Sequence, residues 1–396
     1  MPELKDSFTS TGAKFFWHQE AMQKLRNGKG QPIVTHLMPT DVCNHTCAFC
    51  SVGQREGDVL PFRDMLDYLD ILLRYGLKAV IISGGGNPIL YKCKKTGRNF
   101  NDLVDAIHER GLEIGLITNG MPLREFAFRR SMDDRTFRDS WGTVRPETLD
   151  KLTWIRISMS GLDHEENEVY VPDIDRGKTT LGFSYVAHDI YFDSAEKYHG
   201  KVSTPEDLVT IGDARKEQKG PRYFADRVPE LVEQFRFYVD IYKPSYLRLL
   251  PNCLQPNLIA DRVAMCQKIA DAVDPSCVFV QYKPPKGPNV CYMHIIHPVL
   301  NCDGYVYPCD SVVLAAAELG YQNGRPNHKF DSPWRVCSWK DVSNIYDNPL
   351  QSAIKNPREQ CRGCVFWAGN EILEGVRSGT IEPVRPLVAP VHPNFI

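Results

Sequence analysis

Three cysteines that lie close together constrain this chain more than any other feature of its sequence. Cys43, Cys47 and Cys50 follow a Cys-x3-Cys-x2-Cys spacing within the stretch Asp41–Cys50. This spacing lets three thiolates converge on one small inorganic cluster, whereas a saturated [4Fe–4S] cluster needs four. One iron would then stay open to a ligand from outside the protein. The alternatives are a zinc site or chance clustering, although structural zinc usually has paired cysteines and four complete ligands.

The composition describes an ordinary globular protein. A length of 396 residues suggests two or three domains with a sizeable core. Apolar residues make up 42% of the chain and charged residues 24%, which is typical of soluble domains. The formal charge of −2 gives no overall attraction to nucleic acid or to a membrane surface, although it does not exclude a local basic patch.

The cysteine content and the N-terminal residues indicate the cellular compartment in which the protein is expected. The first residues, Met1–Asp6, lack the apolar core of a signal peptide, and no apolar run is long enough for a membrane span. Thirteen cysteines in such a chain indicate a reducing compartment and metal chemistry, not disulfides. We therefore expect a cytoplasmic protein without a membrane partner.

Short apolar strands alternate with amphipathic helices along most of the chain. The predicted strands are 33–38, 78–83, 113–118, 154–159, 181–187 and 246–250, and the predicted helices are 15–25, 61–75, 100–110, 146–152, 226–242 and 258–273. This alternation predicts βα units and a parallel sheet, hence an α/β fold. Six units are too few for a closed eight-fold barrel.

The pattern changes after the last of these helices. Residues 277–282 and 295–300 look like further strands, and prolines become frequent. We expect a helical extension at 1–31, the α/β domain at 32–275, a small second domain at 276–366 and a tail at 367–396. From Glu382 onward the tail should be extended and packed on the surface.

Two long intervals, 121–145 and 188–225, interrupt the alternation. The first is rich in arginine, and both follow a predicted strand. Loops that leave the carboxyl ends of parallel strands build active sites. We expect these intervals to cover a substrate, with structural decoration as the alternative.

The cysteine stretch resembles the signature of radical S-adenosylmethionine (radical SAM) enzymes. Phe49 stands where that family usually has an aromatic residue before the third cysteine. The resemblance implies that the open iron chelates SAM. It implies that the reduced cluster cleaves SAM to methionine and a 5′-deoxyadenosyl radical, which takes a hydrogen atom from a substrate. It also implies the open (β/α)6 TIM-like partial barrel that the family shares, and a one-electron reductant such as flavodoxin or ferredoxin.

The residues Gly84, Gly85, Gly86 and Asn87, after the second predicted strand, resemble the family's Gly-Gly-Glu-Pro loop. Glycines there let the backbone approach the methionine amino group of SAM. Asn87 departs from the family pattern, in which glutamate is commoner. A glycine-rich loop by itself usually indicates only a turn. This loop follows the cysteines by one βα unit, and that position favours the functional interpretation.

Further SAM contacts are implied by the family at later strand ends. The positions are Asn119, Arg156, Ser158 and, as a weaker candidate, Arg248. Period-two alternation puts Arg156 and Ser158 on one face of their strand. A buried arginine needs an anionic or acceptor partner, such as a bound carboxylate. The alternative is an arginine that reaches solvent.

A second cysteine set lies near the C-terminus. Cys291 is followed after twelve residues by Gly304, after four more by Cys309, and about fifty residues later by Cys361 and Cys364. This layout resembles the Twitch domain, a short relative of the SPASM domain, with a β-hairpin at Asp303–Gly304 and a helix. The resemblance implies one auxiliary [4Fe–4S] cluster. Zinc is the alternative, and the reserve ligands are Cys302 and Cys337.

The resemblance predicts an enzyme of oxidoreductase or isomerase type. Our first hypothesis is hydrogen abstraction from a small polar metabolite or nucleotide, leading to oxidation or rearrangement with help from the auxiliary cluster. The alternatives are radical modification or isomerisation of a hypermodified nucleic-acid base, or of a ribosomal peptide. A non-catalytic iron–sulfur electron carrier or sensor is the remaining alternative, and it would leave the open iron and the glycine loop without a purpose.

Overall fold

The computed structural model describes residues 4–45, 47, 49–50, 57–123, 144–164, 167–190, 222–252, 256–282, 287–310, 321–322, 325–326, 334–355, 357, 361 and 364–396. Most of the two long intervals lies outside the described residues, as does Cys253. The described strands form one sheet of ten, in the order β13-β10-β9-β1-β2-β3-β4-β5-β6-β7, and two sheets of two.

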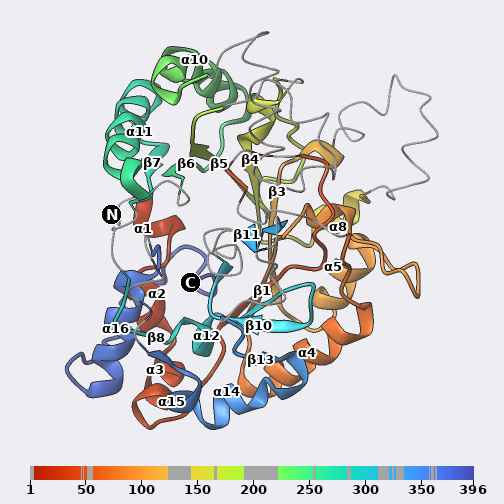
Figure 1. Cartoon of the computed structure of the whole chain (residues 1–396), viewed down its shortest axis with the longest axis vertical. Coiled ribbons are helices and arrows are strands. Elements are labelled where there is room, and N and C mark those ends of the chain that lie inside the picture. Colours follow the sequence, from red (N-terminus) through yellow and green to blue (C-terminus); the bar gives the residue numbers. More distant parts are fainter. Residues whose placement is uncertain are drawn as a thin grey trace.

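Seven consecutive strands of the large sheet run parallel, and they curve into an incomplete ring (Figure 1). They are β1 (Val34–Leu37), β2 (Ala79–Ile82), β3 (Glu113–Thr118), β4 (Trp154–Ser158), β5 (Thr180–Ala187), β6 (Tyr246–Pro251) and β7 (Val278–Val280). The predicted α/β partial barrel is therefore confirmed.

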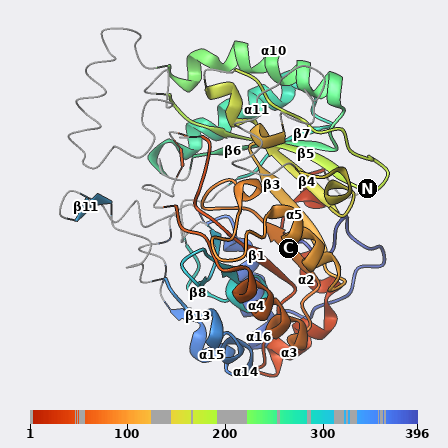
Figure 2. The ribbon, with the colours of Figure 1, turned by 90° about the vertical axis from the view of Figure 1, so that its right-hand side faces the viewer.

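The connecting helices lie outside this ring, with α10 and α11 at one end of the molecule and α4 and α5 along its side (Figures 1 and 2). These helices are α4 (Phe62–Tyr75), α5 (Phe100–His108), α8 (Pro146–Leu149), α10 (Phe224–Tyr242) and α11 (Ile259–Val273). In α4, Met65, Leu69 and Leu72 are buried at helical spacing, and Gly76 ends the helix in the left-handed conformation with φ 107°.

The chain beyond residue 275 extends the same sheet at both edges. Strand β7 pairs with β6, while β9 (Val299–Leu300) pairs in parallel with β1. The hairpin predicted around Asp303–Gly304 is confirmed, since β9 and β10 (Tyr305–Tyr307) are antiparallel. Strand β13 (Cys337–Ser338) pairs antiparallel with β10 at the edge of the large sheet. One two-stranded sheet joins β8 (Val290–Cys291) to β14 (Ile354–Lys355). The other joins β11 (Tyr321–Gln322) to β12 (Arg325–Pro326).

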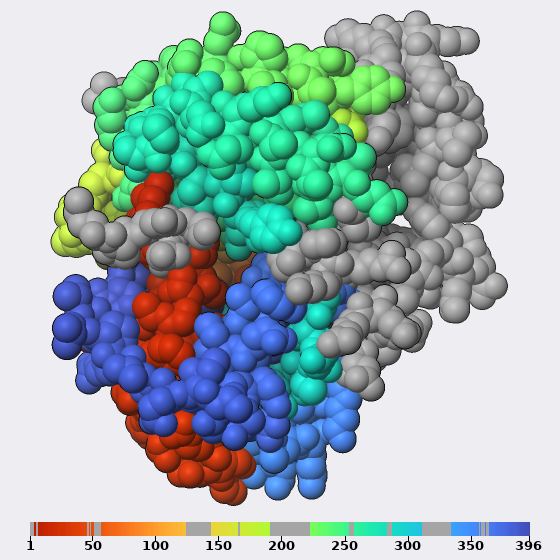
Figure 3. Space-filling model, turned by 90° about the vertical axis from the view of Figure 1, so that its left-hand side faces the viewer, coloured from red at the N-terminus to blue at the C-terminus, as the bar shows by residue number. Residues whose placement is uncertain are grey.

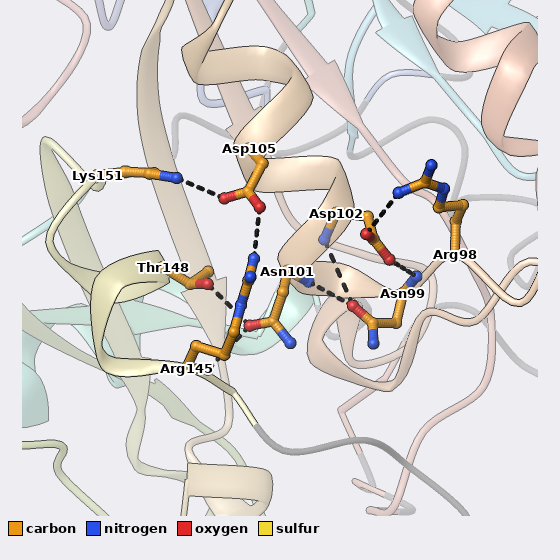
Figure 4. Close-up of polar contacts among 8 residues, drawn as sticks. All are labelled: Arg98, Asn99, Asn101, Asp102, Asp105, Arg145, Thr148 and Lys151. Carbon is orange, nitrogen blue, oxygen red and sulfur yellow. Dashed lines mark hydrogen bonds and ion pairs between the residues drawn. The ribbon is translucent and has the colours of Figure 1, made fainter.

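Helix α5 shows how local sequence sets an element. Asn99 caps it: its side-chain oxygen accepts from the backbone of Asn101 and Asp102, and Asp102 accepts from the Asn99 backbone in return (Figure 4). Further along, Asp105 accepts from Lys151 at 2.6 Å and from Arg145 (Figure 4). These bonds tie α5 to α8, so Arg145, the last arginine of the first long interval, makes a structural ion pair.

Two inward-facing glycines shape the inner wall of the barrel. A Cβ atom at Gly115 would lie 2.1 Å from the Trp154 ring, and one at Gly182 would lie 2.2 Å from the Tyr246 ring. Both contacts are shorter than any van der Waals distance, so only glycine leaves room for these rings. The aromatic side chains of β4 and β6 therefore lie flat across the neighbouring strands.

Most of the remaining helices lie toward the end of the molecule opposite α10, whereas α1 lies near β7 (Figure 1). The remaining helices are α1 (Leu4–Phe8), α2 (Gly12–Trp17), α3 (Gln19–Arg26), α12 (Met293–Ile296), α14 (Ser343–Asp347), α15 (Pro349–Ser352) and α16 (Trp367–Ser378). The single helix predicted at 15–25 is wrong, because His18 is non-helical with ψ 66° and its ring contacts the Pro393 carbonyl at 2.9 Å.

The strand predicted at 295–300 is only partly right. Residues 293–296 form the helical turn α12, and the strand is limited to Val299–Leu300. All four side chains of α12, including that of His294, are buried, so this segment has no exposed face whose periodicity would distinguish a helix from a strand. Pro298, which has no N–H group to donate, separates the two elements.

The C-terminal tail adopts neither helix nor strand from Glu382 onward, as expected, but its end is not on the surface. Phe395 and Ile396 are 7% and 3% exposed, and Phe395 packs edge-on against Trp154 with ring centroids 5.2 Å apart. Lys14 donates to the Phe395 carbonyl at 3.0 Å. The tail and the N-terminal helices therefore close one mouth of the barrel.

Candidate functional site

The loop that carries Cys43, Cys47 and Cys50 leaves the carboxyl end of β1. Its base is held by Thr40, whose hydroxyl donates to the Asp58 carbonyl at 2.9 Å and accepts from the Val42 amide at 3.1 Å. The Cys50 amide donates to the Cys47 carbonyl at 2.9 Å, which turns the loop back on itself. All three cysteines are half-buried.

Other possible ligand atoms also lie close to this loop. The ligand atoms of His45, Cys47 and His164 all lie within 4.8 Å of one another, and so do those of Asp41, Asp58 and Cys302. A [4Fe–4S] cluster would bind each of the three thiolates through a different iron and leave its fourth iron open.

The glycine loop after β2 lies directly against the cysteine loop. A Cβ atom at Gly86 would lie 2.0 Å from the Val42 carbonyl oxygen, and one at Gly84 would lie 2.1 Å from the Gly86 carbonyl oxygen. The Gly86 amide donates to the Thr40 carbonyl at 3.0 Å. This approach requires residues without side chains, which explains the glycines at Gly84 and Gly86. Gly85 lies between them.

Three asparagine side chains join the loops after β1, β2 and β3. The Asn87 amide group donates to the oxygens of Asn44 at 3.1 Å and Asn119 at 2.6 Å, and Asn119 donates to Asn44 at 3.1 Å. The Thr118 hydroxyl donates to the Asn87 oxygen at 3.0 Å. The predicted residues Asn87 and Asn119 thus meet, together with Asn44, which no motif in the sequence had singled out.

Two histidines lie beside the second cysteine. The ring of His164 approaches the Cys47 sulfur with its Nε2 atom at 3.6 Å, and it packs against the His45 ring with centroids 4.1 Å apart and planes tilted by 32°. His164 follows the short 3-10 helix η3 (Met159–Asp163) after β4, which explains why spacing along the chain did not reveal it. A donor at this position can stabilise a negatively charged thiolate.

Phe49 packs on a buried polar network at the ends of β4 and β5. Its ring lies edge-on against His188, with centroids 4.6 Å apart. His188 contacts Asp163 at 3.6 Å, and Asp163 accepts from the Tyr185 hydroxyl at 2.8 Å and from Arg227. Burial lowers the pKa of His188 despite the neighbouring carboxylate. The sequence analysis found Phe49 but not the four polar residues behind it.

The structure brings Arg156 and Arg248 to a second place, inside the barrel. Both line a cavity of about 440 Å³. Arg156 donates to the Tyr246 hydroxyl at 2.9 Å and lies over the Trp154 ring, 5.2 Å from its centroid. Ser158 pairs with Ser184 and Ser184 with Arg248, so these three positions lie at one level of the sheet.

The second cysteine set gathers beside β1 and β9. Burial, with a smaller contribution from the neighbouring Cys361, raises the pKa of Cys291 to about 12. Cys309 lies in an apolar cluster with Met38 and Trp334, on which Cys361 also packs. Cys364 is buried and lines the barrel cavity.

The two reserve cysteines lie elsewhere. The Cys302 sulfur is grouped with the carboxylates of Asp41 and Asp58, near the base of the first cysteine loop. Cys337 is on β13, where it pairs with Val306, and burial raises the pKa of its thiol to about 12.

The region around the first cysteine loop is similar to known proteins. Residues 37–134 match the family model described as the Radical SAM superfamily. A relative from Saccharolobus islandicus, named "Probable GTP 3′,8-cyclase", is 28% identical over 121 residues, which are 29% of this chain and 37% of the relative. The chain therefore spans well under half the length of the curated relative that it matches.

Two solved structures are also similar. One is Streptococcus suis SuiB bound to its precursor peptide SuiA, at 13% identity and a TM-score of 0.46, over 84% of this chain and 68% of that one. The other is native anSMEcpe with bound AdoMet and the Cp18Cys peptide, at 13% identity and a TM-score of 0.44, over 81% of this chain and 82% of that one. Among the described helices, none is long and apolar enough to cross a bilayer.

Proposed function

Because residues 37–134 match the Radical SAM superfamily model, we propose that this chain is a radical SAM enzyme, that Cys43, Cys47 and Cys50 hold its [4Fe–4S] cluster and that SAM binds beside them. When bound, the cluster and SAM would supply the one-electron reduction and the 5′-deoxyadenosyl radical that removes a hydrogen atom from a substrate. The chain's own contribution is to hold the three loops in register, to bind the substrate and to exclude water.

One observation supports this proposal above the others. The side chains of Asn44, Asn87 and Asn119 fasten the loops after β1, β2 and β3 to one another. A ligand at the carboxyl edge of a parallel sheet needs such pre-organised loops. The backbone of Gly84–Gly86 lies beside the cysteine loop, where glycines allow the closest approach of a bound ammonium group to carbonyl oxygens.

For the remaining predicted contacts we propose different roles. Phe49 lies against His188 and would cover one face of the site, while Ser158 is at the end of β4 on the same edge. Arg156 and Arg248 line the barrel cavity, so we propose that they act deeper than the SAM contacts.

We further propose an auxiliary [4Fe–4S] cluster on Cys291, Cys309, Cys361 and Cys364 in a Twitch domain that spans residues 276–366. The support is the effect of the Cys361 thiol on the pKa of Cys291, the shared packing of Cys309 and Cys361, and the position of Cys364 three residues further on. A fully ligated cluster on the cavity wall suits electron transfer to or from a substrate.

The reaction we propose is oxidation or rearrangement of a small polar metabolite or nucleotide. The partial similarity to a protein named a GTP 3′,8-cyclase supports a nucleotide. Modification of a peptide or of a nucleic-acid base is the second candidate. A one-electron reductant such as flavodoxin or ferredoxin and a cytoplasmic location complete the proposal.

Anaerobic reconstitution tests the central claim. With iron, sulfide, dithionite and SAM, the wild-type protein should release 5′-deoxyadenosine, whereas Cys50→Ala should release none. The matched control is Cys266→Ala, which removes a buried thiol of α11 outside both cysteine sets. Absence of 5′-deoxyadenosine from the fully reconstituted wild-type protein would show that the proposed function is wrong.

A further inference from the structure

The barrel cavity lies between the closed mouth of the barrel and the sheet's carboxyl edge. Its walls are inward-facing side chains of the strands, such as Ile81 and Ile117, and its floor includes residues 7–10 and the segment 392–396. Figure 3 shows the N-terminal residues in red, between the helices of 224–273 in green and teal and the C-terminal segments in blue. A volume of about 440 Å³ is large enough for a small molecule.

Two arginines on this wall donate hydrogen bonds to neutral side chains. Arg248 donates to the Gln281 side-chain oxygen at 2.8 Å, and its Nε atom is buried without a hydrogen-bond partner. Arg156 donates to the Tyr246 hydroxyl at 2.9 Å. In the part of the chain that the structure describes, neither guanidinium forms an ion pair with a carboxylate.

The other buried arginines behave differently. Arg227 is 2% exposed and pairs with Asp163, and Arg262 is 7% exposed and pairs with Asp189 at 2.6 Å. Both follow the rule that a charge removed from water is paired. Arg156 and Arg248 are half-buried, and neither has such a carboxylate partner among the described residues.

The two arginines carry most of the positive charge around the cavity. Burial lowers the pKa of Lys14, which also lines the cavity, to about 7, and Asp310 is an acidic lining residue. Burial, and then the charge of Arg156, lower the pKa of Arg248 to about 9, although Asp310 raises it. A cation that is disfavoured by burial and by a second cation is stabilised by an anion between the two.

We propose that the barrel cavity binds an oxyanion of the substrate, a phosphate or a carboxylate, between the guanidinium groups of Arg156 and Arg248. This inference rests on the proposed function, since it assigns the anionic part of the substrate to the cavity. The planar guanidinium can donate two parallel bonds to such an oxyanion, and Gln281 and Tyr246 hold the two arginines in place.

Calorimetric titration with pyrophosphate and with malonate, at constant ionic strength, tests the proposal without turnover. We expect one of them to bind the wild-type protein at one site per chain. Arg248→Met should weaken this binding by about ten- to a hundredfold, and Arg248→Lys should weaken it less. Arg236→Met, which removes an exposed arginine of α10 that bonds the Ala272 carbonyl, should bind as the wild type does. The anion that binds identifies phosphate or carboxylate as the group recognised.

The proposal is overturned if neither anion binds the wild-type protein saturably, or if Arg248→Met binds as tightly as the wild type. If Arg248→Met does not fold, Arg156→Met is judged by the same criterion. Formation of 5′-deoxyadenosine without anion binding would refute this inference alone, whereas anion binding without 5′-deoxyadenosine would refute the proposed function alone.

Discussion

Asn87 donates a hydrogen bond of 2.6 Å to the side-chain oxygen of Asn119. The two residues are 32 positions apart, at the ends of neighbouring parallel strands. Because Asn87 also donates to Asn44, three loops that begin on three strands share one hydrogen-bonded centre. This centre gives the glycine loop after β2 a definite position beside the cysteine loop.

Asn87→Asp should loosen this centre. The change keeps the shape but replaces the donor by an oxygen that faces the Asn44 and Asn119 oxygens. Loss of buried hydrogen bonds costs about 1–3 kcal/mol, so we expect SAM affinity to fall about tenfold in equilibrium dialysis, with a lower melting temperature. Asn99→Asp is the control, since the Asn99 side chain only accepts. Wild-type SAM affinity in Asn87→Asp would contradict this role.

Iron and sulfide analysis should separate the two cysteine sets. Two [4Fe–4S] clusters give about eight of each per chain, and the double variant Cys309→Ser, Cys361→Ser should retain about four. It should still release 5′-deoxyadenosine. Cys302→Ser should retain about eight, because its sulfur lies with Asp41 and Asp58. About four iron atoms in the wild-type protein, with zinc present, would refute the auxiliary cluster.

His164→Phe should make the reduction potential of the first cluster more negative. The His164 ring lies 3.6 Å from the Cys47 sulfur, and a donor near a thiolate stabilises the more negative, reduced state. A redox titration followed by electron paramagnetic resonance measures the change. His108→Phe, at the exposed end of α5, is the control. An unchanged potential in His164→Phe would show that the contact is only steric.

Gly182→Ala should destabilise the barrel. Its Cβ atom would meet the Tyr246 ring at 2.2 Å, and this ring is the partner of Arg156. Overpacking of this kind costs about 1–3 kcal/mol, so thermal unfolding should occur at a lower temperature. Gly177→Ala, where the Asp175 side chain 3.2 Å away can move, should have little effect. Equal melting temperatures of both variants and the wild type would contradict the argument.

Acid should destabilise the protein through His294. Burial lowers its pKa to about 4, while the unfolded histidine titrates near 6.5. Between these values the unfolded chain binds more protons, so stability is full above pH 6.5 and decreases by about 3 kcal/mol as the pH falls to 4. His294→Gln cannot titrate and should show a flatter profile of melting temperature against pH between these limits. His108→Gln should follow the wild type, and parallel profiles for all three proteins would refute the assignment.

The sequence by itself determined the cysteine motif, the glycine loop and most helices and strands. Strand β3 is predicted with its exact bounds and α4 to within one residue, because each depends on neighbouring residues and on periodicity. Helix α12 was missed, since four buried residues in a row have no periodicity.

Only the tertiary structure decided which distant side chains meet. Asn44 meets Asn87 and Asn119, and His164 meets Cys47 across 117 positions. Arg156 and Arg248 share a cavity that the C-terminal segment helps to close, although that segment was expected on the surface. Such contacts depend on the order of the strands in the sheet and on which side chains the curved sheet buries. Strand order and burial in the barrel leave no periodic pattern in the sequence. The loops and the cavity therefore form a site only in the folded, curved sheet.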